Sequence, residues 1–173
     1  MKRVFLSATY EDQTDLIEEI KSKLAELEIK VIHFTEPDFF DGRTGIHSHD
    51  ICIEKVKSIP NYLLIMNYTA GSDYEGNNPD YKGLSITHAE FRSALESINE
   101  NRKMYCFVRR KVMDIYDIWK QSSNNHKNDA SWRVESKVFQ LLEDMKTKGV
   151  WIDFFQHSLE LKQILSAKEF VTD

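Results

Sequence analysis

The sequence predicts an α/β fold in which a central, mainly parallel sheet of about five strands lies between layers of helices. Short apolar runs alternate along the chain with longer segments whose apolar residues recur at the spacing of one helix face. The run Tyr62–Met66 is apolar throughout, which is typical of a central strand buried on both faces. Polar loops follow the strands. Right-handed crossovers would bring these loops to one edge of the sheet, where such folds bind ligands.

The chain begins with a strand, a helix and a second strand. The first strand is expected at Lys2–Ala8, and Ser7, Thr9 and Asp12 crowd into the turn at its end. The second strand is expected at Lys30–Phe34. The helix between them is predicted by an apolar stripe that faces away from Glu and Lys residues: Leu16, Ile17, Ile20, Leu24 and Leu27.

A long loop at Thr35–Ser48 follows the second strand. It contains Phe39 and Phe40 together with proline and glycine residues, and loops of this length are usually functional. A weaker helical pattern at His49–Ile59 leads into the strand Tyr62–Met66.

The second half of the chain continues the alternation. A second long loop is expected at Asn67–Leu84, where it would form a rim of the site, and it leads into a helix. The later elements are expected in this order: a strand at Met104–Val108, a helix at Val112–Lys120, a polar surface loop at Gln121–Ala130, a helix at Val134–Met145 ended by Gly149, a strand at Val150–Phe154 and a helix at Leu159–Phe170.

Glu90 is the candidate catalytic residue, because it lies where the second long loop turns into a helix. Thr87 is a good N-cap, and Phe91, Ala94 and Leu95 begin the apolar face of that helix. Glu90 follows Thr87 by three residues, so one interpretation is a capping box in which Glu90 binds the backbone N–H of Thr87. The other is a carboxylate held ionised near the helix N-terminus and directed at a ligand. The two interpretations are compatible.

Length and charge narrow the class of protein. With 173 residues and 41% hydrophobic residues, the chain is expected to form a single domain, 1–173. The net charge of −5 and the scattered basic residues argue against a nucleic-acid partner. No run reaches the about 7–15 apolar residues of a signal peptide or the about 18 of a membrane span, so a cytoplasmic location is expected. Cys52 and Cys106 are interpreted as reduced packing residues.

The motif search is mostly negative. The chain lacks the glycine patterns of dinucleotide-binding and P-loop proteins and the G-x-S-x-G of α/β-hydrolases. His47, His49 and Asp50 lack a further ligand at defined spacing, so no metal site is expected. The basic triplet Arg109–Lys111 is interpreted as a solvated strand end, and His88 as a surface residue of the first helical turn.

Two segments carry a resemblance to known proteins. Val4–Asp12 and Ser85–Ala94 resemble the Toll/interleukin-1 receptor (TIR)-like superfamily, within it the bacterial branch that opens with VFxSSTYxD. Ser85-x-Thr87-x-x-Glu90 is also similar to the helix start that carries the catalytic glutamate of nucleoside 2-deoxyribosyltransferases. The resemblance implies a flavodoxin-like or TIR-like three-layer fold and an enzyme that cleaves N-glycosidic bonds.

The activity that the resemblance implies is NAD(P)+ glycohydrolysis in bacterial antiphage defence or signalling, with NAD+ as a substrate and no cofactor. It implies self-association through the loop 35–48, a nucleotide ligand and no membrane partner. Glu90 would be catalytic, and the substrate-binding residues would be Ser7, Thr9, Asp12, Phe39, Tyr81, Ser85 and Thr87. Phe39, Phe40 and Tyr81 could stack on a base, although packing in the core or within the loop is the safer interpretation of each.

Two alternatives remain open from the sequence. One is a non-catalytic TIR-like signalling or nucleotide-sensing module in which Glu90 is only a cap. The other is a base hydrolase related to the nucleoside deoxyribosyltransferases.

Overall fold

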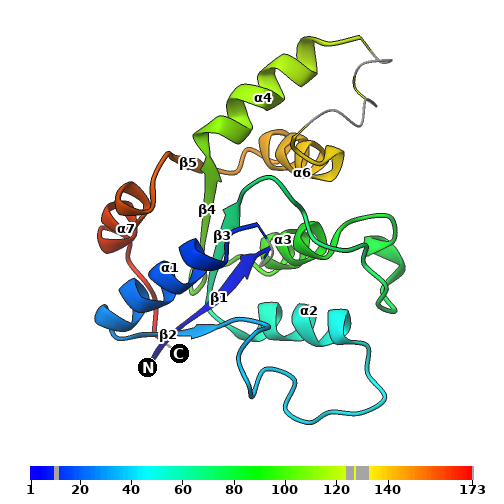
Figure 1. Cartoon of the computed structure of the whole chain (residues 1–173). Helices are drawn as coiled ribbons and strands as arrows, with labels where there is room; N and C mark the ends of the chain where they lie inside the picture. Colours follow the sequence, from blue (N-terminus) through cyan, green and yellow to red (C-terminus); the bar gives the residue numbers. More distant parts are fainter. Residues whose placement is uncertain (10–11, 124–126, 128–132, 173) are drawn as a thin grey trace.

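The predicted fold class is confirmed. The computed structural model describes residues 1–9, 12–123, 127 and 133–172. Its sheet has the order β2-β1-β3-β4-β5, and every neighbouring pair of strands is parallel (Figure 1). The strands are β1 (Lys2–Ala8), β2 (Ile29–Ile32), β3 (Asn61–Met66), β4 (Lys103–Arg109) and β5 (Ile152–Phe155).

Helices cover both faces of this sheet and complete a flavodoxin-like three-layer fold. The described helices are α1 (Thr14–Glu26), α2 (Ser48–Ser58), α3 (Ile86–Glu96), α4 (Arg110–Gln121), α6 (Ser136–Thr147) and α7 (Ser158–Ser166), with a short 3-10 helix η1 (Pro79–Tyr81) before α3.

The uniformly apolar strand β3 is central, as its sequence predicts. Leu63 and Ile65 pack into the core beneath α1 and α7, whereas Tyr62, Leu64 and Met66 pack into the core beneath α2, α3 and α6. All five side chains are almost fully buried. Since side chains alternate between the faces of a strand, burial of both sets requires helices on both faces.

The strand order creates the crevice that the sequence predicts. The chain runs outward from β1 to β2 and then crosses back to place β3 on the other side of β1. The connections that leave β1 and β3 therefore diverge at the carboxyl ends of these strands, and a space opens between them.

The basic triplet lies at the end of β4 as predicted, and two of its three residues are exposed. Arg109 ends β4 and α4 begins at Arg110, without the intervening loop that the sequence pattern suggests. The guanidinium group of Arg109 lies 5.5 Å from the ring centre of Phe155, and that of Arg110 lies 5.7 Å from Phe154. Both arginines thus pack over the last strand, while Arg110 and Lys111 stay exposed to solvent.

Gly149 and the two cysteines are placed as the sequence predicts. Gly149 adopts a φ of 67° directly after the cap of α6 and ends that helix, as expected. Cys52 and Cys106 are free and buried. Most of the polar stretch Gln121–Ala130 lies outside the described residues. In the part of the chain that the structure describes, no helix is long and apolar enough to cross a membrane.

Candidate functional site

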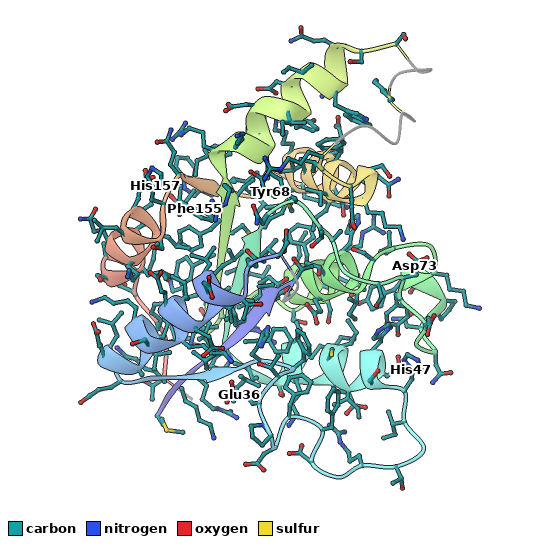
Figure 2. All side chains as sticks on the ribbon, in the orientation of Figure 1. Glu36, His47, Tyr68, Asp73, Phe155 and His157 are labelled. Atoms are coloured by element: carbon teal, nitrogen blue, oxygen red, sulfur yellow. The ribbon has the colours of Figure 1, made fainter. Side chains whose placement is uncertain are left out.

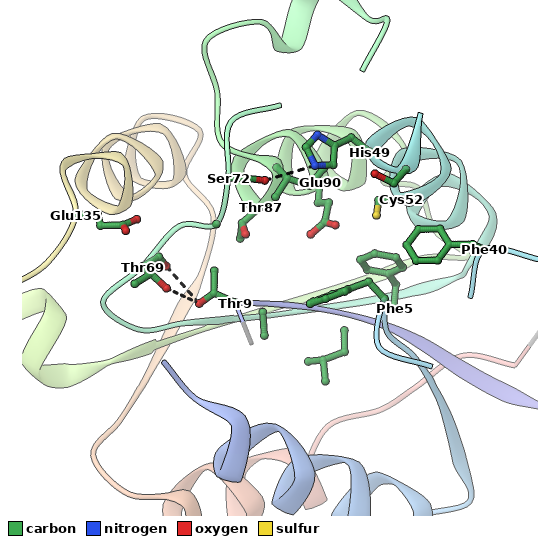
Figure 3. Close-up of a pocket in the computed structure, with 16 residues that line it drawn as sticks. Phe5, Thr9, Phe40, His49, Cys52, Thr69, Ser72, Thr87, Glu90 and Glu135 are labelled. Atoms are coloured by element: carbon green, nitrogen blue, oxygen red, sulfur yellow. Dashed lines mark hydrogen bonds between the residues drawn. The ribbon is translucent and has the colours of Figure 1, made fainter. Parts of the chain in front are cut away.

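A pocket of about 660 Å³ opens at the carboxyl ends of β1 and β3 (Figure 3). The turn after β1, the loop before α2 and the loop before α3 all contribute to it, so the polar segments converge as the fold class predicts. Its described lining residues are Phe5, Leu6, Ala8, Thr9, Phe34, Phe40, Ser48, His49, Cys52, Thr69, Gly71, Ser72, Ile86, Thr87, Glu90 and Glu135.

Glu90 is the buried carboxyl group of this pocket. Its side chain comes from α3 and is directed into the space between Thr9 and Phe40, and the residue is 7% exposed (Figure 3). Ser7 donates a hydrogen bond from Oγ to Glu90 Oε2 at 2.5 Å, and the thiol of Cys52 lies beside the carboxylate. Burial raises the pKa of Glu90 to about 7, although the Ser7 hydroxyl and the Cys52 thiol both favour the ionised form.

The helix that carries Glu90 starts earlier than predicted. Ser85, not Thr87, is the N-cap of α3, because its Oγ accepts a hydrogen bond from the backbone N–H of His88 at 3.2 Å. Ile86 is the first helical residue, so Glu90 lies beyond the first turn and the capping-box interpretation is wrong. Ser85 is buried as a cap and does not line the pocket, whereas Thr87 does.

His88 is also placed differently from the prediction. It is 4% exposed, and its Nε2 lies 2.9 Å from Asp144 Oδ2 on α6. The same carboxylate accepts a hydrogen bond from Arg92 at 2.8 Å. This arrangement joins α3 to α6. Because Asp144 lies far from His88 in the sequence, no local sequence pattern indicates that His88 is buried.

Thr9 and Asp12 form one hydrogen-bonded unit, but only Thr9 lines the pocket. Thr9 donates to Asp12 at 2.8 Å and accepts from Thr69 Oγ1 at 2.9 Å. Asp12 also accepts the backbone N–H groups of Tyr68 at 2.9 Å and Thr69 at 3.2 Å. Asp12 thus holds the end of β3 against the end of β1, and this positions the two threonine hydroxyls on the pocket wall.

The aromatic residues of the pocket differ from those expected. Phe39 is 2% exposed and packs on Phe5 in the core, with ring centres 6.2 Å apart, whereas its neighbour Phe40 lines the pocket. Tyr81 is also buried away from the pocket, where its hydroxyl donates to Glu96 at 2.9 Å. Phe34, just beyond the end of β2, and Phe5 on β1 also line the pocket. The sequence of two adjacent phenylalanines does not show which ring faces the core and which faces the pocket.

His49 and Glu135 line the pocket without having been proposed as ligand-binding residues from the sequence. His49 lies in the first turn of α2, and its pattern with His47 pointed only to a weak metal site. Glu135 caps α6 and accepts the backbone N–H of Ala70 at 2.9 Å. Among the described residues, no group of three or more His, Cys, Asp or Glu side chains is placed to hold a metal ion.

The pocket has an acidic lining. Glu90 and Glu135 are its carboxyl groups, and no lysine or arginine is among the described residues that line it. The residues outside the described ranges include neither lysine nor arginine. A positive charge that develops on a ligand inside the pocket is therefore favoured, and a phosphate group is better placed at the rim.

The fold and the site define a flavodoxin-like α/β protein with a buried carboxyl group at the topological switch point of its sheet. The family model described as a domain of unknown function, DUF4062, matches residues 3–168, and the chain belongs to this family. No curated protein matches the chain.

Among solved structures, the chain is similar to the CMP N-glycosidase BcmB of Clostridium botulinum. The two share 16% sequence identity with a TM-score of 0.51, over 96% of this chain and 100% of that chain. At this level of identity the similarity shows a shared fold. The TIR-like assignment stays a prediction from the sequence.

Proposed function

We propose that this protein is an N-glycosidase that cleaves the bond between ribose and a base, with Glu90 as the catalytic carboxylate. The observation that carries the proposal is the buried Glu90 side chain, which faces a pocket of about 660 Å³, accepts a hydrogen bond from Ser7 and lies beside the thiol of Cys52. This volume is in the usual range for small-molecule sites. The fold shared with a CMP N-glycosidase supports the same reaction class.

The proposed reaction uses the charge of Glu90 and one water molecule. The bond between C1′ of the sugar and the base nitrogen breaks, and its electron pair leaves with the base. The sugar becomes positively charged in the transition state, and a fixed carboxylate stabilises that charge strongly in a pocket whose described lining contains no lysine or arginine. Water then adds to C1′, and Glu90 accepts a proton from it, for which a pKa of about 7 is well matched.

NAD(P)+ is the first proposed substrate. Nicotinamide bound to ribose is itself cationic, which suits the acidic lining of the pocket. Thr9, Thr69 and Thr87 present hydroxyl groups to the sugar, while the phosphate groups would extend past the rim. No cofactor enters this reaction. A role in antiphage defence or signalling is proposed from the TIR-like resemblance.

Incubation with a substrate panel tests the proposal. The panel contains NAD+, NADP+, CMP, cytidine and deoxycytidine, each at a low and a high protein concentration, with base release followed by chromatography. Release of nicotinamide or cytosine is the expected result. Absence of release from every member at both concentrations would overturn the glycosidase assignment, and binding without cleavage would favour a nucleotide-sensing module.

We also propose that copies of the protein associate through the loop 35–48. Phe40 and Ile46 of this loop are 36% and 41% exposed, and Phe40 also lines the pocket. Contact between copies at this loop would therefore change the pocket. A rise in activity per molecule with protein concentration, matched by a rise in sedimentation coefficient, is the expected result, and activity per molecule that is independent of concentration would contradict it.

The pH dependence of activity separates the possible roles of Glu90. If the ionised form is active, kcat/KM rises about tenfold for each pH unit below the pKa and levels off above it. Burial raises the pKa of Glu90 to about 7. The rise in kcat/KM is therefore expected to level off near pH 7, well above the usual pKa range of a glutamate. Initial rates at low substrate concentration between pH 5 and pH 9 measure it. A fall of kcat/KM with rising pH would assign Glu90 the role of an acid instead.

Phe40→Ala is expected to raise KM about tenfold, because stacking of a base on an aromatic ring contributes about 1–3 kcal/mol. The free energy of unfolding should change little, since Phe40 is 36% exposed. Phe39→Ala is the matched comparison. It removes a ring that is 2% exposed, so it should lower the stability instead. Steady-state kinetics and urea unfolding of both variants distinguish the two effects, and an unchanged KM in Phe40→Ala would remove this ring from the proposed binding site.

A further inference from the structure

His49 lies close to Glu90 on the wall of the pocket. Cys52, which contacts the Glu90 carboxylate, lies three residues after His49 on α2. Residues at this spacing are neighbours on a helix surface, with about 5–6 Å between their Cβ atoms. His49 is thus about one helical turn from the Glu90 contact, and Figure 3 shows the two side chains lining the same space.

The hydrogen bonds of His49 fix its tautomer. Nδ1 accepts the backbone N–H of Glu75 at 3.0 Å, so the neutral ring carries its proton on Nε2. Nε2 lies 3.5 Å from Ser72 Oγ, which is at the outer limit of a hydrogen bond and leaves this N–H available to a ligand. Burial, with a smaller effect of His47, lowers the pKa of His49, so the ring stays neutral at pH 7.

The ring is also held in place by its neighbours. It stacks on Tyr74 with 5.9 Å between ring centres, and His47 meets it edge-on at 4.7 Å. The hydroxyl of Tyr74 donates to Asp50, which also accepts the backbone N–H of Asn77 at 3.0 Å. These contacts join the start of α2 to the loop before α3, so the Nε2–H group is preorganised.

We infer that His49 donates a hydrogen bond from Nε2–H to the departing base, which makes nucleosides and nucleotides with uncharged bases substrates alongside NAD(P)+. The inference rests on the proposed glycosidase function. When the C1′–N bond of cytidine breaks, the electron pair makes the base an anion, whose charge spreads onto its carbonyl oxygen and ring nitrogens. A fixed donor stabilises that charge, and the base then takes its proton from water. Nicotinamide departs neutral and gains less from the donor.

Two substitutions at one position test this role. In His49→Asn the side-chain oxygen can still accept the Glu75 N–H, but the donor at the Nε2 position is lost. In His49→Gln the longer side chain can return an N–H donor to that position. We expect His49→Asn to lower kcat about a hundredfold on CMP and less than about threefold on NAD+, since loss of one donor to developing charge costs about 10²–10³. His49→Gln should recover most of the loss on CMP.

His47→Asn is the matched control. Figure 2 shows His47 at the outer end of α2, and it is not among the described residues that line the pocket. Its Nδ1 caps the helix by accepting the His49 N–H at 3.2 Å, so its replacement can loosen α2 without removing a donor from the pocket. Because its ring also packs on His49, a small selective loss on CMP is expected, well below the hundredfold loss in His49→Asn.

The outcomes separate the two proposals. If the wild type cleaves CMP and NAD+ but His49→Asn lowers both rates equally, His49 is not the donor to the base, and the glycosidase function stands. If the wild type cleaves NAD+ but neither CMP nor cytidine, the wider substrate class is wrong. If it cleaves nothing, both proposals fail. The nitrogen-15 spectrum of labelled histidine gives an independent check: a proton on Nδ1 instead of Nε2 would overturn the assignment of the donor.

Discussion

Glu90→Gln is expected to lower kcat/KM at least about a thousandfold on every substrate that the wild type cleaves. The substitution keeps the size of the side chain and can still accept the hydrogen bond that Ser7 donates at 2.5 Å. It removes the negative charge that would stabilise the positively charged sugar, and it removes the group that would accept a proton from water. Base release under single-turnover conditions, with protein in excess, measures the effect without interference from product release.

Glu96→Gln is the control for loss of a carboxylate from the same helix. Glu96 is exposed at the end of α3 and accepts a hydrogen bond from Tyr81 outside the pocket. This variant should keep the wild-type rate. A Glu90→Gln variant that retains more than about a tenth of the wild-type activity would show that Glu90 is not the catalytic carboxylate.

The stability of the protein should depend on pH through the same residue. Burial raises the pKa of folded Glu90 to about 7 from an ordinary value of 4.5. The folded state therefore binds the proton more tightly than the unfolded state. The associated stability is fully present below pH 4.5 and is lost as the pH rises through about 7. A shift of this size corresponds to about 3 kcal/mol, at about 1.4 kcal/mol for each pKa unit.

Glu90→Gln isolates this contribution because it leaves all other titrating groups in place. The free energy of unfolding of the variant should exceed that of the wild type by about 1 kcal/mol at pH 5 and by about 3 kcal/mol at pH 8. Urea unfolding of both proteins at the two pH values measures the difference. A stability difference that stays constant between pH 5 and pH 8 would show that Glu90 titrates near its ordinary pKa.

The ionised Glu90 side chain destabilises the folded protein at neutral pH. Its presence in the pocket despite this cost is consistent with a functional role. Most buried carboxylates are stabilised by a cation or by several N–H donors. Glu90 receives a hydrogen bond from the hydroxyl of Ser7 and lies beside the thiol of Cys52, and no lysine or arginine is among the described residues that line its pocket. The charge of Glu90 thus stays available to a ligand.

The strands could be predicted because their signal is local. Lys2–Ala8 has the same bounds in the structure as in the prediction, and β3 begins one residue before the predicted Tyr62. Burial on both faces requires an unbroken apolar run, and such a run is visible in the sequence without knowledge of its neighbours. The convergence of the polar loops followed from the parallel topology, which is set by the alternation of strands and helices.

The sequence by itself determined the fold class, the edge of the sheet where the pocket lies and the prominence of Glu90, because these depend on periodicity and on the direction of parallel strands. Only the tertiary structure decided that Ser85 caps α3, that Phe40 rather than Phe39 faces the pocket, and that His49 lines the pocket with its Nδ1 bound to the Glu75 N–H. Each of these depends on one hydrogen bond or one packing contact. Neighbouring side chains of similar chemistry could make the same contact. Which of them makes it depends on residues distant in the sequence that come close only in the folded protein.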